Sequence, residues 1–120
     1  MPKTILHLDD EEDIRTLIAE YLGRHGFRLV SVNTPTAAFK AVQLEKPDLV
    51  ISDLQLDDAD GLETVKQLRK ILPDTPMMIL TGVLLDAKTA DDTVGKVVSA
   101  YLEKTTSLAN ILAEVRRLTG

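Results

Sequence analysis

Several polar residues of this chain stand at the ends of short apolar runs, and their types could support phosphoryl-transfer chemistry. They are Asp9 and Asp10, Asn33, Asp53, Thr81 and Lys104. Three of these side chains are carboxylates, which repel one another strongly at close range unless a cation neutralises them or one takes a proton. Oxygen ligands in that number suit Mg²⁺ or Mn²⁺, which commonly share a site with phosphate. A carboxylate can also be the nucleophile that becomes an aspartyl phosphate, and Asp53 is central in the set.

The rest of the sequence predicts the elements that bring these residues together. Five apolar runs read as buried strands and alternate with segments of helical period; the runs cover residues 3–8, 27–32, 48–53, 77–81 and 97–102. Four of the helices are expected to begin at capping residues, which are Asp10, Thr34, Asp60 and Ser107. Gly26 stands where a helix C-terminal cap is expected. The stretch 82–96 predicts only a poorly amphipathic helix.

Regular alternation of strands and helices predicts an α/β fold of the (βα)5 type, a doubly wound parallel sheet of five strands with helices on both faces. The 120 residues are taken as one domain, 1–120, because this length has room for only one core. An eight-unit barrel would need about twice the length, so an open sheet is expected. In the flavodoxin-like strand order 2-1-3-4-5, the first and third strands are neighbours about 4.8 Å apart. Asp9, Asp10 and Asp53 would then converge at the carboxyl edge of the sheet, with Lys104 two strands away.

Composition excludes several classes of function. A net charge of −5, with Lys and Arg dispersed along the chain, argues against nucleic-acid binding by this domain. No apolar run is long enough to span a bilayer, so no membrane association is expected. The chain has no cysteine, which excludes disulfides and thiolate metal sites and fits the cytoplasmic location that we predict.

Five short motifs occur in a characteristic order and spacing along the chain. They are LDDEE at 8–12, DLVISDL at 48–54, DGLE at 60–63, LTG at 80–82 and YLEK at 101–104. With these motifs the whole chain resembles a known family, the receiver domains of two-component response regulators, of the chemotaxis-regulator type. The resemblance implies that Asp53 is the phosphoacceptor. It further implies that Asp9 and Asp10 help Asp53 to hold Mg²⁺ and that the backbone carbonyl of Gln55 completes the protein ligands.

The same resemblance implies roles for three more residues and for partner proteins. Thr81 and Lys104 would contact the phosphoryl oxygens, and Tyr101 would be the aromatic residue that reorients when Thr81 moves. A histidine kinase or phosphotransfer protein would donate the phosphoryl group. A protein target or a fused output domain would read the changed surface around the fourth helix, fifth strand and fifth helix, and a phosphorylation-dependent homodimer is a further expectation. The domain would be no enzyme in the ordinary sense, because it would catalyse only its own phosphorylation and dephosphorylation.

Three features depart from the family pattern. The family usually has a proline after its lysine, often with a cis peptide bond, whereas this chain has Thr105, so we expect a trans bond there. The common proline four residues past the phosphoacceptor is Asp57, with Asp58 beside it, which adds negative charge near the expected cation site. The spacing from Gly95 to Lys104 is longer than usual, which indicates an atypical output face.

One other function stays open beside phosphorylation, and two are disfavoured by the sequence. A degenerate receiver that keeps the fold as a phosphorylation-independent interaction module remains the alternative. A haloacid-dehalogenase-type phosphatase would need a second carboxylate two residues after the nucleophile, where this chain has Gln55. Nucleotide binding is disfavoured because the sequence has neither a glycine-rich dinucleotide fingerprint nor a phosphate loop. The sequence fits a stand-alone regulator as well as a fragment of a longer regulator or hybrid kinase.

Overall fold

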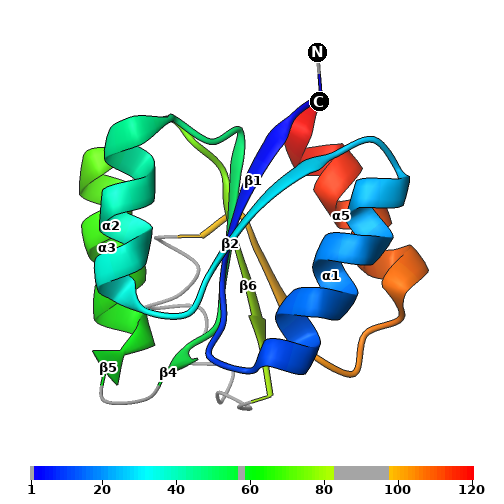
Figure 1. The fold of residues 1–120 in the computed structure, drawn as a ribbon, viewed down its shortest axis with the longest axis horizontal. Helices are drawn as coiled ribbons and strands as arrows, with labels where there is room; N and C mark the ends of the chain where they lie inside the picture. Colours follow the sequence, from blue (N-terminus) through cyan, green and yellow to red (C-terminus); the bar gives the residue numbers. More distant parts are fainter. Residues whose placement is uncertain (1, 57–58, 83–97) are drawn as a thin grey trace.

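A five-stranded parallel sheet forms the middle layer of the computed structural model, which describes residues 2–56, 59–82 and 98–120. The strands of this sheet are β1 (Thr4–Leu8), β2 (Arg28–Val32), β3 (Leu49–Ser52), β6 (Met77–Thr81) and β7 (Ala100–Glu103). The described helices are α1 (Glu12–Arg24), α2 (Pro35–Leu44), α3 (Gly61–Ile71) and α5 (Leu108–Thr119). Helices α2 and α3 cover one face of the sheet, and α1 and α5 cover the other (Figure 1).

The strand order is β2-β1-β3-β6-β7, which confirms the flavodoxin-like order 2-1-3-4-5 predicted from the sequence. The predicted strands agree with the observed ones to within a few residues at each end. The structure adds a two-stranded antiparallel hairpin that the sequence analysis did not predict, made by β4 (Gln55–Leu56) and β5 (Ala59–Asp60). The weak helix predicted for 82–96 lies, apart from Gly82, outside the described residues.

Helix starts follow the predicted caps with one exception. Side chains of Thr34, Asp60 and Ser107 each accept backbone N–H groups of the first turn that follows them. The prediction of Asp10 as the cap of α1 was wrong, because the N-cap residue is Glu11, whose side chain makes no capping hydrogen bond. The carboxylate of Glu11 contacts Lys104 instead. Gly26 has a φ of +91°, the left-handed conformation expected after a helix C-terminus.

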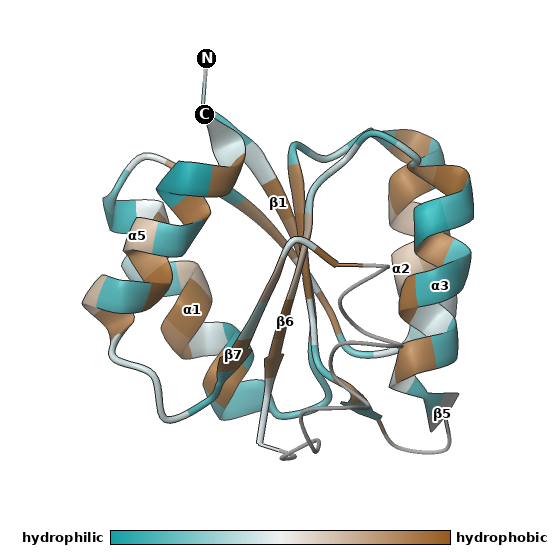
Figure 2. Ribbon diagram, turned by 180° about the vertical axis from the view of Figure 1, so that it is seen from behind, coloured by the Kyte–Doolittle hydropathy of each residue, from teal (hydrophilic) through white to brown (hydrophobic). Residues whose placement is uncertain are grey.

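Two aliphatic clusters hold the helices against the sheet. One lies between the sheet and α2 and α3, and the other between the sheet and α1 and α5. Successive strand residues supply opposite faces, so buried Met77 packs in the first cluster and buried Met78 in the second. Figure 2 shows the consequence as hydrophobic strands between helices whose outer faces are hydrophilic. The core therefore leaves the carboxyl edge of the sheet as the place where polar residues meet.

Gly61, the first residue of α3, approaches the chain directly after β3. A Cβ atom at Gly61 would lie 2.4 Å from the backbone oxygen of Leu54, a distance that no real contact allows. The absence of a side chain at Gly61 therefore lets the start of α3 pack against the segment that follows Asp53.

Candidate functional site

Asp9 and Asp53 directly follow neighbouring strands, and each carboxylate accepts the backbone N–H two residues further along the chain. The N–H of Asp53 donates to the carbonyl oxygen of Leu8 at 3.0 Å, so the pairing of β1 and β3 continues to this aspartate. Asp53 Oδ1 then accepts the N–H of Gln55 at 3.0 Å, and Asp9 Oδ1 accepts the N–H of Glu11 at 2.9 Å. Both carboxylates are buried, with exposed fractions of 0% for Asp9 and 2% for Asp53. Each side chain thus has one oxygen held by a local turn and the other left to face its neighbour.

Lys104 follows β7 and reaches back to both aspartates. Its backbone N–H donates to the carbonyl oxygen of Thr81 at 2.9 Å, which anchors the residue to the neighbouring strand. Its Nζ lies 2.8 Å from Asp53 Oδ2, 3.0 Å from Asp9 Oδ2 and 2.5 Å from Glu11 Oε1. One ammonium group therefore contacts three carboxylates, and the predicted convergence of Asp9, Asp53 and Lys104 is found in the structure.

The electrostatics of this cluster follow from burial and mutual contact. Burial raises the pKa of Asp9 above its ordinary value, and the charge of Asp53 adds to the rise, although the N–H of Glu11 and Lys104 oppose it. For Lys104 burial lowers the pKa, but hydrogen bonds to Asp53, Glu11 and Asp9 outweigh burial and raise it above the ordinary value. The lysine therefore stays charged, while the Asp9 carboxylate lacks part of the stabilisation that water would give its charged form.

The acidic residues also fit a divalent cation. Carboxylate oxygens of Asp9, Asp10, Glu11 and Asp53 lie within 4.8 Å of one another. Asp9 Oδ2 is buried and lies 3.0 Å from the Lys104 ammonium, so a positive charge already faces this oxygen. Hard oxygen donors in this number and spacing match the preference of Mg²⁺ or Mn²⁺. The backbone of Gln55 lies beside Asp53, and its carbonyl oxygen as a ligand stays a prediction.

Glu11 is the site residue that sequence reasoning missed. Its contact with Lys104 and its place among the clustered oxygens put it in the site, although its side chain is 60% exposed. The available signal was its position directly after the acidic pair, where the chain has left β1 and has not yet entered α1. The same contact explains why Glu11, although it occupies the N-cap position, does not cap α1 with its side chain.

Thr81 and Tyr101 lie on the two strands beside the acidic cluster. Thr81 ends β6 and is fully buried, and Tyr101 is half-buried in β7, where it pairs in register with Ile79. Ile79 and Tyr101 both pack with the core cluster under α2 and α3. Since side chains alternate along a strand, Thr81 lies on that same face, two residues beyond Ile79. Thr81 and Tyr101 thus lie on the face of the sheet that α2 and α3 cover. A movement of Tyr101 coupled to that of Thr81 requires this placement, and the movement itself stays a prediction.

The departures from the family pattern can be located in part. All peptide bonds of the described residues are trans, including the bond between Lys104 and Thr105, as expected from the missing proline. The Thr105 hydroxyl donates to Glu103 Oε2 at 3.3 Å. Asp57, Asp58 and Gly95 lie outside the described residues, so the predictions about the acidic loop and the long spacing before Lys104 stay predictions.

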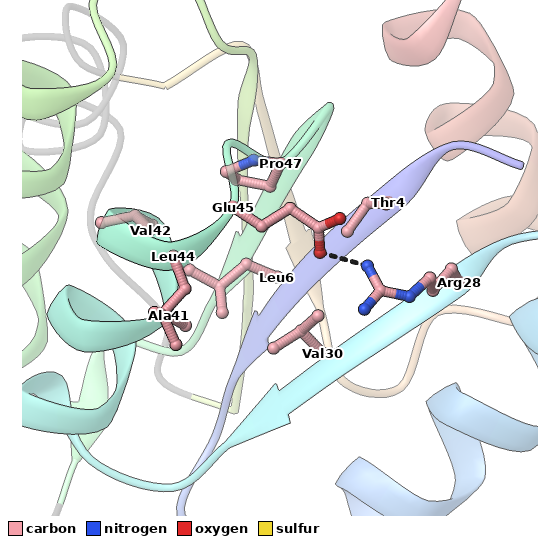
Figure 3. Close-up of a pocket in the computed structure, with 9 residues that line it drawn as sticks. All are labelled: Thr4, Leu6, Arg28, Val30, Ala41, Val42, Leu44, Glu45 and Pro47. Carbon is pink, nitrogen blue, oxygen red and sulfur yellow. Dashed lines mark hydrogen bonds and ion pairs between the residues drawn. The ribbon is translucent and has the colours of Figure 1, made fainter.

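A separate hollow lies at the amino end of the sheet, between β1, β2 and α2. Its walls are mostly aliphatic, from residues such as Leu6, Val30 and Val42, and Figure 3 shows Arg28 and Glu45 joined across it. Arg28 and Glu45 pair with each other at the rim of this hollow, and both side chains are about half exposed. The candidate for chemistry is therefore the carboxyl edge.

The fold and the site together define a class, the flavodoxin-like α/β domain whose carboxyl edge holds an acidic cluster and a lysine. Comparison with protein families identifies the class more closely, because residues 5–116 match the model of the response regulator receiver domain. The chain belongs to the response regulator receiver domain family. No helix in the described part of the chain is long and apolar enough to cross a membrane.

Curated relatives are response regulators of greater length. The alkaline phosphatase synthesis transcriptional regulatory protein PhoP of Bacillus subtilis is 40% identical over 82 residues, which are 68% of this chain and 34% of that protein. The response regulator protein VraR of Staphylococcus saprophyticus is 34% identical over 120 residues, covering 98% of this chain and 56% of that protein. The matched segments therefore span between about a third and just over half of these relatives' length.

Solved structures agree with the family and the fold. The BeF3-activated N-terminal receiver domain of Klebsiella pneumoniae RstA has a TM-score of 0.87 and 32% identity, with 97% of both chains covered. The response regulator TrrA of Thermotoga maritima, solved in complex with Mg²⁺ and BeF, has a TM-score of 0.85 and 28% identity over 97% of this chain and 98% of that chain.

Proposed function

We propose that this receiver domain takes a phosphoryl group on Asp53, in the presence of Mg²⁺, from a phosphohistidine of a histidine kinase or phosphotransfer protein. The observation that supports this most is the contact of Lys104 Nζ with Asp53 Oδ2 at 2.8 Å inside a cluster of four acidic side chains. A buried nucleophile, a set of cation-binding carboxylates and a positively charged side chain are the parts that phosphoryl transfer requires.

In the proposed reaction a carboxylate oxygen of Asp53 attacks phosphorus, and an O–P bond forms as the P–N bond to the donor histidine breaks. The electron pair of the broken bond stays on the histidine nitrogen, which leaves as neutral imidazole when its other ring nitrogen carries a proton. The N–H of Gln55 holds one oxygen of Asp53 and so restricts the orientation of the nucleophile. Hydrolysis reverses the state, because attack of water on phosphorus releases inorganic phosphate and restores the carboxylate.

The other site residues supply charge and shape. Asp9, Asp10 and the carbonyl of Gln55 would hold Mg²⁺ together with Asp53, and the bound ion would offset the negative charge that collects during transfer. Lys104 would exchange its contacts with Asp9 and Glu11 for the new phosphoryl oxygens, because these oxygens carry more negative charge than one carboxylate. The Thr81 hydroxyl would contact the phosphoryl group from the face of the sheet that α2 and α3 cover.

Phosphorylation is proposed to act through a change of surface. Movement of Thr81 toward the phosphoryl group would open space beside Tyr101, which lies on the same face of the sheet. The altered surface would be read by a protein target, by a fused output domain or by a second copy of the domain. The greater length of the curated relatives supports an output domain, and the chain would act on no substrate other than its own phosphoryl group. A cytoplasmic location belongs to the same proposal.

The test is intact-mass spectrometry after incubation with Mg²⁺ and acetyl phosphate or phosphoramidate. We expect one added phosphoryl group on the wild type, none on Asp53→Asn and none on the wild type in EDTA. Asp74→Asn is the matched control, because it makes the same chemical change on an exposed turn outside the acidic cluster and should leave the adduct intact.

An absent adduct has one further check, binding of beryllium fluoride with Mg²⁺, which mimics the phosphoryl group without being hydrolysed. Binding of this analogue together with a missing adduct would mean rapid hydrolysis. Failure of both would refute the proposed phosphorylation and leave the alternative, a degenerate receiver that acts as a phosphorylation-independent interaction module.

A further inference from the structure

His7 is a buried polar residue directly beneath the acidic cluster. It lies in β1, pairs in register with Ser31 and Ile51, and has no exposed surface. Its position in the strand places it on the face covered by α1 and α5, between Ile5 and Asp9. Neither ring nitrogen has a hydrogen-bond partner among the described residues. A histidine here costs free energy that an aliphatic side chain, such as those of Ile5 and Ile51 around it, would avoid.

The unpartnered Nε2 of His7 faces the Asp9 oxygen that Lys104 contacts. His7 Nε2 lies 3.9 Å from Asp9 Oδ2, too far for a hydrogen bond, and makes none in the described part of the chain. A hydrogen bond between nitrogen and oxygen needs about 2.7–3.2 Å, so a shift of roughly 1 Å would join them. Lys104 Nζ contacts the same oxygen at 3.0 Å, and that contact draws the carboxylate toward the lysine.

The ring can supply the donor that this geometry requires. A histidine ring carries an N–H on Nε2 or on Nδ1, and Nε2 is the nitrogen that lies 3.9 Å from Asp9 Oδ2.

We propose that His7 is a positioning residue for the cation site, whose Nε2–H donates a hydrogen bond to Asp9 Oδ2 when a divalent cation replaces the Lys104 ammonium beside Asp9. The inference rests on the proposed function, since it assumes that Asp9 is a metal ligand. Carboxylates that bind metals are held in orientation by hydrogen bonds from the next layer of residues, and losing such a partner costs 10- to 100-fold in metal affinity. His7 is the described residue placed to serve Asp9 in this way from within the sheet.

The first experiment compares Mn²⁺ affinity of the full chain, read from the EPR signal of free Mn²⁺, for wild type and two variants. His7→Leu keeps a bulky side chain but has no donor, and we expect its Kd to rise about 10- to 100-fold. His7→Gln restores an amide donor at similar reach, and we expect a Kd within about threefold of wild type. The melting temperature of His7→Leu in EDTA should equal or exceed that of wild type, because the substitution removes two unpaired polar atoms. Weaker binding with unimpaired folding is an outcome that a merely structural role would not produce.

The second experiment uses the wild type and so does not depend on folding of a variant. Nitrogen-15 NMR of the imidazole rings identifies which nitrogen carries the proton with and without Mg²⁺, and His25 is the internal control because it is exposed and is the other histidine of the chain. We expect the Nε2–H form of His7 in the Mg²⁺-loaded domain. The Nδ1–H form there, or equal Mn²⁺ affinity of wild type and His7→Leu, would overturn the inference and leave the proposed function standing. A wild type that binds neither ion would refute both.

Discussion

Replacing Lys104 by methionine tests whether the lysine and a divalent cation share one position. The substitution keeps the length of the side chain and removes the ammonium that contacts Asp9, Asp53 and Glu11. Asp9 and Asp53 are almost fully buried and Lys104 is 11% exposed, so the loss leaves buried carboxylates without a counter-charge. Breaking a buried ion pair in this way costs about 3–5 kcal/mol. Since the pKa of Asp9 is already raised, proton uptake by its carboxylate would limit the loss of folding stability to about 3 kcal/mol in the absence of Mg²⁺.

Mg²⁺ should reverse most of this destabilisation. Two unit charges about 4 Å apart interact by roughly 4 kcal/mol at an effective dielectric constant of 20, and a divalent ion doubles the repulsion from the ammonium. Lys104 can move away, so only part of this repulsion opposes binding in the wild type. We expect Mg²⁺ to bind Lys104→Met at least about tenfold more tightly than wild type, which corresponds to about 1.4 kcal/mol.

The assay is urea unfolding followed by circular dichroism, with EDTA and with a series of Mg²⁺ concentrations. Because a ligand that binds only the folded state stabilises it by RT ln(1 + [L]/Kd), the series gives Kd for each protein. Lys46→Met is the matched control, since Lys46 is exposed in a loop outside the site, and its effect should stay within about 0.5 kcal/mol. Equal or weaker Mg²⁺ binding by Lys104→Met would refute the reasoning, because the ammonium would then support the cation instead of competing with it.

Further substitutions test backbone packing, helix capping and the titration of a buried histidine. Gly61→Ala should destabilise the domain by about 2 kcal/mol or more, because the added Cβ would clash with Leu54. Gly23→Ala is the control with open space around its Cβ, and it should stabilise helix α1 by about 0.5–1 kcal/mol. Thermal melts of the two variants measure both effects. Ser107→Ala removes the cap of α5 and should cost about 1 kcal/mol in urea unfolding. Because the pKa of His7 is about 4 in the folded chain and 6.5 as the ordinary value, the unfolded state binds more protons between these values, and stability falls as pH falls through this window. In EDTA the free energy of unfolding of the wild type should fall by about 2 kcal/mol more than that of His7→Val between pH ~7 and ~5. Equal decreases in the two proteins would contradict the lowered pKa of His7.

The sequence was sufficient for the fold and for the centre of the site because both follow from periodicity. Continuous apolar runs separated by helical stripes determine a parallel sheet, and the ends of its strands determine where Asp9, Asp53 and Lys104 meet. For Lys104 the sequence predicted only that its side chain could reach back across two strands toward the aspartates. Its contacts with particular oxygens come from the register of β6 and β7, which fixes the Lys104 backbone to Thr81.

Features governed by a few residues were beyond the sequence patterns. The β4–β5 hairpin has two residues in each strand, too few to show alternation. The cap of α1 was wrongly placed at Asp10 because Asp is a preferred N-cap by type and Glu is not, whereas the actual start of the helix depends on what each side chain meets in space. Glu11 and His7 gain their importance from contacts with Lys104 and Asp9, which no local pattern encodes.

The ion pairs of Lys104 also bear on the order in which the domain assembles during synthesis. Lys104 lies 95 residues from Asp9 and 93 from Glu11 along the chain, so the lysine leaves the ribosome long after the carboxylates that it neutralises. A nascent chain with β1 and β3 already paired would hold Asp9 and Asp53 side by side with no ammonium between them. Until the last strand docks, only a proton or a cation from solution can relieve that repulsion, so we expect Mg²⁺ to act first as a folding aid and afterwards as a partner in signalling.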